Sequence, residues 1–245
     1  THHFPGGLYS TCNQYLSQFP GFPAVSLKHT ILKKIMRKFF SVGLTGGIAS
    51  GNSSARKYLG QAHGAHVIDA DLLGHACYVP GHPCLEQVLD AFGRDRLLTK
   101  GTLDRAKLGG IVFSDKSQLE KLNSIVWPYI RSALSEQLAT VRKEAEAEES
   151  SFGNEQKTTI VVVEAAVLLE ASWSDLFDEV WVVHVDPEVA CRRLMERNSL
   201  SLVEAQKRQQ SQISNDARLL QCSVGISNND DVLTLEKNLD KEVRC

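Results

Sequence analysis

The residues whose types and spacing are clearest for chemistry lie in the stretch GGIASGNSS, between Gly46 and Ser54. Its first eight residues follow the spacing G-x-x-x-x-G-x-[ST], in which glycines let the backbone curl so that successive N–H groups point at phosphate oxygens. A bland glycine-rich turn would explain the glycines but not the serine pair. The spacing therefore predicts a nucleotide-phosphate loop made of Gly46, Gly47, Ile48, Ala49, Ser50, Gly51, Asn52, Ser53 and Ser54.

One position of this loop departs from the usual chemistry. Asn52 stands where such loops carry a lysine that reaches the β- and γ-phosphates with a full charge. Asparagine is shorter and neutral, and losing a charge-assisted contact costs about 1.5–3 kcal/mol. Losing a preorganised donor lowers rates by roughly 10²–10³. We expect binding to survive and turnover to fall, with Ser53 placing a hydroxyl on Mg²⁺ and Ser54 adding a phosphate donor.

Two carboxylates follow the second apolar run, in the sequence VIDAD. Asp69 and Asp71 are two residues apart, so in an extended segment both side chains face the same side. One of them accepts a proton from an attacking hydroxyl, or one holds magnesium through water. The alternative is a pair of caps for a helix that starts at LLGHA, a position that suits Asp71. Spacing alone favours neither interpretation.

A basic segment later in the chain, ACRRLMERNSLSLVEAQKRQQSQ, has the pattern of two helices joined by NSLS. Its cations are Arg192, Arg193, Arg197, Lys207 and Arg208. Arginines on a helical hairpin are suited to a lid that closes over a γ-phosphate and excludes water. The alternative is a solvated basic face.

The composition sets outer limits on function. The chain has 245 residues, of which 42% are apolar and 23% charged, as in ordinary globular proteins. A net charge of −2 gives no electrostatic reason to expect nucleic acid or an anionic membrane as a partner. No apolar run reaches the length of a membrane span. Six cysteines without a CxxC pair indicate free thiols in a reducing setting.

Residues 1–38 differ from the rest, because they are rich in proline and glycine and end in a basic, apolar run. No acidic residue precedes Asp69. This pattern is typical either of an irregular basic leader or linker, or of a mitochondrial presequence. We expect a cytoplasmic protein, with a mitochondrial location as the alternative.

Five apolar runs are predicted to be strands, at residues 39–45, 65–70, 158–169, 179–185 and 222–227. Helical spacing separates them, for example along residues 119–134. Apolar strands that alternate with helices predict an α/β fold with a parallel sheet covered on both faces. Residues 71–150 are predicted to form a helical insertion beside the carboxyl edge of the sheet, where such sheets bind ligands.

Five ordered segments resemble the dephospho-coenzyme A kinases over about residues 40 to 240. They are VGLTGGIASG, VIDAD, GTLDRAKLGGIVF, VVVEAAVLLE and CRRLMERN. The resemblance implies a P-loop NTPase domain at residues 39–245, with an adenylate-kinase-like five-stranded parallel sheet. It further implies a substrate-binding insertion at 71–150 and a lid at 188–213. The implied reaction uses ATP and Mg²⁺ to phosphorylate the ribose 3′-hydroxyl of dephospho-CoA, the last step of CoA biosynthesis.

The same resemblance assigns roles to individual residues. Asp71 matches the catalytic aspartate that accepts the proton of the 3′-hydroxyl, and Arg197, with Arg193, is expected to contact phosphate. Glu164 is expected to support magnesium through water, and the alternatives are Glu170 or neither residue. The remaining expected contacts are Asp69 and Arg105 to substrate and Asn228 near adenine, although a turn asparagine explains Asn228 equally well.

Several alternatives stay open at this point. The segments VWPYIR and AAVLLEASW resemble the kinase domain of the animal bifunctional coenzyme A synthase. That likeness implies a phosphopantetheine adenylyltransferase domain, either fused to this one or acting as its partner. Because of Asn52, the alternative to an active kinase is a catalytically impaired domain that binds nucleotide or CoA. A nucleotide kinase of other specificity also fits the fold, whereas a GTPase is disfavoured because no N-K-x-D motif occurs.

Overall fold

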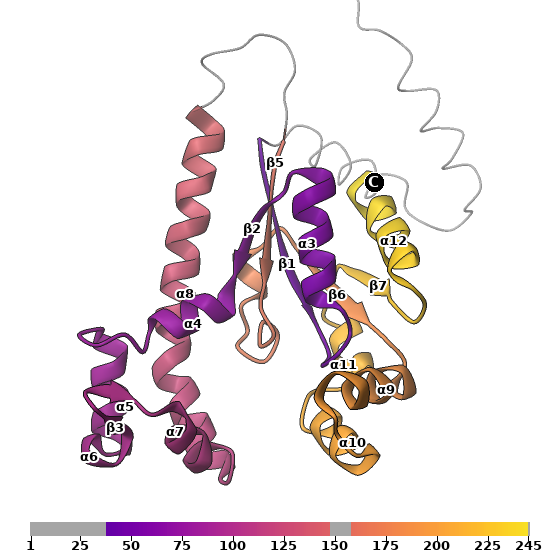
Figure 1. Cartoon of the computed structure of the whole chain (residues 1–245). Coiled ribbons are helices and arrows are strands. Elements are labelled where there is room, and N and C mark those ends of the chain that lie inside the picture. The colour runs from indigo at the N-terminus through magenta and orange to yellow at the C-terminus, as the bar shows by residue number, and fades with distance from the viewer. Residues whose placement is uncertain (1–37, 148–157, 245) are drawn as a thin grey trace, which may run out of the picture. The chain divides into compact units, whose positions relative to one another are not determined.

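The computed structural model describes residues 38–147 and 158–244. Five parallel strands form one sheet in the order β2-β5-β1-β6-β7 (Figure 1). Their bounds are β1 Phe39–Gly46, β2 His66–Asp69, β5 Thr159–Glu164, β6 Glu179–His184 and β7 Val224–Ser227. The predicted parallel α/β sheet is therefore confirmed.

One strand, β5, ends five residues before its predicted limit, whereas the others differ from their predicted bounds by at most two residues at either end. The apolar run at residues 158–169 is a strand only as far as Glu164, and turns follow. The backbone N–H of Ala165 still donates to Leu44 O at 3.0 Å, after which Leu168 packs into the core. Apolar residues continue past the strand because this turn is buried, and burial without periodicity does not mark where a strand ends.

The two faces of the sheet bury alternate residues. On β1, Phe40, Val42 and Leu44 pack with α3 (Asn52–His63) and α12 (Val232–Arg244), which lie side by side in Figure 1. Phe39 and the alternate valines of β5 pack on the opposite side, in the larger core cluster that holds α8. Both faces are covered, which explains why the strands are almost continuously apolar.

Helix α8 (Lys116–Ala147) is the long element of the insertion. Its buried residues recur every three to four positions, namely Leu122, Val126, Ile130, Leu134, Leu138 and Val141. This spacing places them on a single helix face. The helical periodicity predicted for this segment is confirmed.

Shorter elements complete the insertion beside α8. They are α4 (Ala70–Ala76), α5 (Pro83–Phe92), α6 (Arg94–Leu97) and α7 (Arg105–Val112). An antiparallel pair, β3 (Leu98–Thr99) and β4 (Thr102–Leu103), was not predicted. Each strand has two residues, too few for a period to show, and the turn between them places Lys100 and Gly101 at positive φ.

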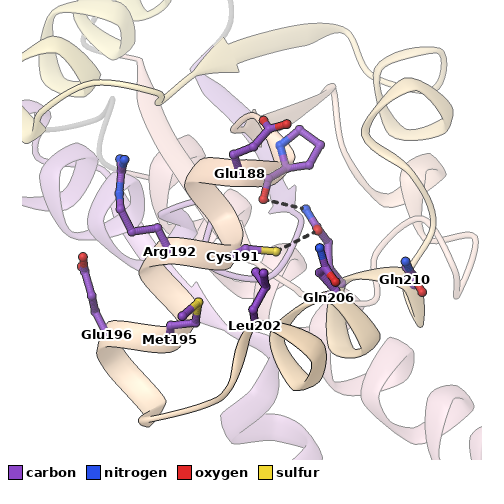
Figure 2. Close-up of a pocket in the computed structure, with 10 residues that line it drawn as sticks. Glu188, Cys191, Arg192, Met195, Glu196, Leu202, Gln206 and Gln210 are labelled. Atoms are coloured by element: carbon purple, nitrogen blue, oxygen red, sulfur yellow. Dashed lines mark hydrogen bonds between the residues drawn. The ribbon is translucent and has the colours of Figure 1, made fainter.

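The segment predicted as a lid forms two helices, α9 (Pro187–Asn198) and α10 (Leu202–Gln210), and a short α11 (Asn215–Leu219) follows. Ser201 and Glu204 form a capping box that starts α10. Figure 2 shows Cys191 beneath the groove between α9 and α10, where Gln209 Oε1 accepts from Cys191 Sγ at 3.4 Å. The two-helix prediction is confirmed. No helix in the described part of the chain combines the length and apolar character of a membrane span.

Candidate active site

The loop from Gly46 to Ser53 connects β1 to α3 and requires glycine at two positions. A Cβ on Gly46 would lie 2.2 Å from Val183 O. Gly51 has φ +102°, and a Cβ there would lie 2.3 Å from Asn228 Nδ2. Since only glycine tolerates both the positive φ and the close approach, the loop holds the curled shape that the spacing predicts.

The positive end of α3 opens into the site. Gly51 is the N-cap residue, and no side chain caps the helix. The first N–H groups of a helix have no partner within it, so together with the helix dipole they favour an anion. They border a cleft of about 720 Å³. Besides Gly46 to Ser54, the cleft is lined by Asp71, Glu164, Ala166, Arg193, Glu196, Arg197 and Gln212.

Asn52 braces the loop from within. Its Nδ2 donates to Gly46 O at 3.3 Å, and Ser50 Oγ donates to Asn52 Oδ1 at 3.1 Å. The side chain is thus turned back onto the loop that contains it. It reinforces the curled shape but supplies no positive charge to the cleft.

Asn228 holds the same loop from the other side. It is only 6% exposed, and its Nδ2 donates to Ser50 O at 2.6 Å. This contact, between residues far apart in the chain, satisfies a buried carbonyl. The structure therefore places Asn228 against the phosphate loop, and the predicted contact to adenine stays a prediction.

Two side-chain oxygens that could bind a metal ion lie close together where α3 begins and β5 ends. Ser53 Oγ donates to Glu164 Oε1 at 2.8 Å, and both residues line the cleft. Within the described residues, no three acidic, histidine or cysteine side chains form a metal-binding group. Mg²⁺ usually takes few protein oxygens and completes its shell with water and phosphate, so a hydroxyl beside a carboxylate fits its chemistry.

Arg56, which the sequence interpretation missed, links the acidic residues of this edge. Its Nε lies 2.7 Å from Glu164 Oε2, and its Nη1 lies 2.9 Å from Asp69 Oδ2. Burial nevertheless raises the pKa of Glu164, and the charges of Asp69 and Asp71 add to the rise, while Ser53 and Arg56 oppose it. Its place in the sequence could have indicated this role, because Arg56 lies one helical turn after Ser53 and so shares a face of α3 with it.

The two aspartates where β2 ends and α4 begins have different roles. Asp69 is the N-cap of α4, and its Oδ1 accepts from Asp71 N at 3.0 Å. The capping interpretation is therefore right for Asp69 and wrong for Asp71, which is the second residue of the helix. Asp71 lines the cleft instead and remains accessible. Partial desolvation raises its pKa, Asp69 adds to the rise, and His75 and Arg56 oppose it.

Only two of the five basic lid residues line the cleft with the loop, namely Arg193 and Arg197. Arg193 Nη2 donates to Asp230 O at 3.0 Å, and Arg197 Nε donates to Asn198 Oδ1 at 3.0 Å. Arg192 lines the separate groove between α9 and α10, a cavity of about 610 Å³ (Figure 2). Neighbouring residues on a helix point about 100° apart, and here Arg192 lies on the side of the groove while Arg193 lies on the side of the cleft.

Two further candidates lie outside the cleft. Arg105, the first residue of α7, donates from Nη2 to His75 O at 3.4 Å and stacks 5.4 Å above the Tyr78 ring. Glu170, the alternative magnesium residue, pairs with buried Arg218 at 3.2 Å and does not line the cleft. Glu164 is therefore the better placed of the two glutamates. The substrate contact of Arg105 stays a prediction.

Comparisons with known proteins agree with this geometry. The family model for dephospho-CoA kinase matches residues 40–234. A dephospho-CoA kinase of Geobacter sulfurreducens is 38% identical over 200 residues, which covers 82% of this chain and 95% of that protein. One from Shouchella clausii is also 38% identical and covers 77% of this chain and 89% of its own.

Solved structures show the same fold. TT1252 from Thermus thermophilus superposes with a TM-score of 0.64 at 26% identity, covering 84% of this chain and 96% of that one. Dephospho-CoA kinase from Campylobacter jejuni gives a TM-score of 0.54 at 24% identity, covering 84% and 97%. From the family match and the two relatives above, the chain belongs to the dephospho-CoA kinase family.

Proposed function

We propose that this chain transfers the γ-phosphate of ATP to the ribose 3′-hydroxyl of dephospho-CoA, which yields CoA. One observation carries the proposal. In a chain of this family, an uncapped helix N-terminus with a curled glycine loop and the Asp71 carboxylate line a single cleft. Phosphoryl transfer needs little covalent chemistry from a protein, and depends mainly on positioning and on neutralising phosphate charge. This cleft has the parts for both.

In this proposal each part of the cleft has one task. The N–H groups of the loop and of the first turn of α3 hold the phosphates. Asp71 accepts the proton of the attacking hydroxyl, a role that needs a carboxylate with room beside it. Arg197 and Arg193, on the lid, neutralise the charge that develops on the transferred group.

We assign the magnesium site to Ser53 and Glu164, whose oxygens lie 2.8 Å apart. When bound there, Mg²⁺ would neutralise phosphate charge. Arg56 keeps the Glu164 carboxylate oriented and offsets part of its charge. Such support around a ligand residue fixes its direction toward the ion.

The alternative is an impaired domain that binds nucleotide or CoA without turnover. This alternative rests on Asn52, because the Asn52 side chain is neutral and is hydrogen-bonded to Gly46 and Ser50. The relatives do not favour this alternative, since they are named as kinases. We therefore keep the kinase function and propose that Asn52 lowers the rate of phosphoryl transfer. The lid arginines then supply part of the positive charge that a lysine at position 52 would provide.

The deciding experiment measures which acceptor receives phosphate. The protein and its Asn52→Lys variant are incubated with γ-labelled ATP and Mg²⁺, and with dephospho-CoA, AMP or CMP. We expect labelled CoA alone, with more of it from the variant. Label on AMP or CMP, or no label from either protein, would overturn the proposal.

Three predictions about its biology stay predictions. They are the closeness to the animal bifunctional enzyme, the fused or partner phosphopantetheine adenylyltransferase domain, and the cytoplasmic or mitochondrial location. The predicted leader or linker at residues 1–38 lies outside the described residues except for Lys38.

A further inference from the structure

The lid and the phosphate loop are joined at the apex of the loop. Ile48 and Ala49 pack against a small core formed by Cys191, Leu194 and Ala205 of the lid helices. Ala49 adopts φ +60°, which is unusual for a residue with a side chain. The apex of the loop thus packs against the lid, so a displacement of the lid helices would also displace the loop.

A hydrogen bond reinforces this junction. The backbone N–H of Ile48 donates to Gln212 Oε1 at 2.8 Å. Gln212 follows the end of α10 and lines the cleft beside the loop. The side-chain oxygen therefore comes from the lid segment, and the N–H comes from the loop.

The N–H of Ile48 is one of the groups that a curled phosphate loop presents to an anion. In this structure the acceptor is a neutral carboxamide oxygen, while the first turn of α3 has no side-chain cap. Gln212 Oε1 thus occupies a position at hydrogen-bond distance from a phosphate-binding donor. A bound triphosphate and Gln212 would compete for the same N–H.

We infer that Gln212 is a positioning residue of the nucleotide site: it holds the Ile48 N–H when no triphosphate is bound and yields it to phosphate on binding. Release of Gln212 frees the end of α10 from the loop, and so links lid movement to nucleotide occupancy. This inference rests on the proposed function for the identity of the nucleotide, but its test is a binding measurement.

Two nearby glutamines provide matched controls. Gln209 ties the lid helices to each other, because its Oε1 accepts from Cys191 Sγ and its Nε2 donates to Pro187 O at 3.4 Å. These contacts are the dashed lines in Figure 2. Gln210, labelled in the same view, is exposed. Neither of them contacts the Ile48 N–H, whose acceptor is Gln212.

The test compares two substitutions with opposite expected signs. Calorimetry measures binding of a non-hydrolysable ATP analogue with Mg²⁺ to the full chain. Gln212→Ala removes the competitor, so we expect affinity to rise about two- to tenfold. Gln212→Glu places a carboxylate on the same N–H, which binds it more strongly and repels phosphate, so we expect affinity to fall about tenfold or more. Gln209→Ala and Gln210→Ala should bind within about twofold of the parent.

A merely structural glutamine would lower affinity in both variants, and that result would overturn the inference. Equal affinity in all variants would overturn it as well. If a variant is poorly folded, the test is instead made on the unaltered chain, by following the NMR resonance of the Ile48 amide. It should move on titration with the analogue as Gln212 is displaced, and a resonance that stays in place would contradict the inference. Acceptor transfer is measured separately, so a failed binding series and a failed kinase assignment are distinguishable.

Discussion

The phosphate loop is fixed by buried contacts, whereas the lid carries its charges on accessible side chains. Ser50 is 2% exposed, and its carbonyl and hydroxyl are both hydrogen-bonded, to Asn228 and Asn52 respectively. Arg197 is exposed and bonds only to the adjacent Asn198 among the contacts of the described residues. The loop is therefore preorganised, while the lid arginine is free to find a new partner.

The difference between the preorganised loop and the accessible lid arginines assigns nucleotide binding to the loop and support of phosphoryl transfer to the lid. Under the proposed function, the uncapped N–H groups at the start of α3 bind phosphate without rearrangement. Within the loop, the Ile48 N–H must first leave Gln212, and the Ser50 N–H already donates to Gly47 O at 3.1 Å. Positive charge, however, is lacking in the loop because Asn52 is neutral. Under the proposed function, we expect this chain to depend on its lid arginines for positive charge more than a chain with a lysine in the loop would.

The largest effect is expected at Asp71, which belongs to neither the loop nor the lid. Asp71→Asn removes the proton acceptor but keeps the shape, so we expect turnover with dephospho-CoA to fall about 10³-fold. ATP affinity should not change. Steady-state kinetics and calorimetry measure the two quantities, with exposed Asp95→Asn on α6 as control. Undiminished turnover would show that loop and lid alone are sufficient.

The next effect tests the dependence on the lid. Arg197→Ala removes one cation from the cleft, and we expect kcat to fall about 10²-fold. Arg192→Ala, in the groove between the lid helices, should leave kcat within about twofold. Equal losses for both variants would mean that the basic lid acts only through its overall charge.

The third prediction adds the missing positive charge to the loop, and so tests how far the lid arginines replace it. Asn52→Lys should raise turnover about 10²-fold, because a charged donor then reaches the phosphates. The nucleotide-free variant should melt slightly lower, since the bonds to Gly46 O and Ser50 Oγ are lost. In the double variant with Arg197→Ala, the loss caused by Arg197→Ala should be smaller. A parent as fast as the lysine variant would remove the argument for impairment.

A smaller effect is expected on stability. Asn228→Ala leaves the buried Ser50 carbonyl without its donor, at a cost of about 1–3 kcal/mol in the free energy of unfolding. Urea denaturation measures this loss. Asn229→Ala loses only an exposed bond to the Asp186 amide and should cost less. Equal costs would indicate that the loop is not held through Asn228.

The smallest effect concerns pH. The pKa of Asp71 is raised above the usual 3.8 by partial desolvation and by Asp69. A base must be deprotonated, so kcat/KM should fall as the pH drops through a pKa above that value. For stability the sign is opposite, because a raised pKa in the folded state favours folding as the pH falls through that same pKa. The acid limb of the rate profile should be absent from Asp71→Asn.

The positions of the five strands along the chain, the glycine loop and the two lid helices were predictable from sequence, because each is set by local spacing. Contacts between distant segments were not. Arg56 with Glu164, Asn228 with Ser50, and Gln212 with Ile48 depend on how strands and helices pack. Helical phase did contain one unused signal, since it separates Arg192 from Arg193. The cap at Asp69 depended on where β2 ends, which apolar periodicity leaves uncertain by a residue or more.

The most direct test of the central claim is a crystal structure of the Asp71→Asn variant with ATP, Mg²⁺ and dephospho-CoA. The account predicts phosphate oxygens on the backbone N–H groups of the loop and of the first turn of α3. It also predicts the ribose 3′-hydroxyl within hydrogen-bond distance of the side chain at position 71. A loop without phosphate, or a 3′-hydroxyl directed away from that side chain, would contradict it.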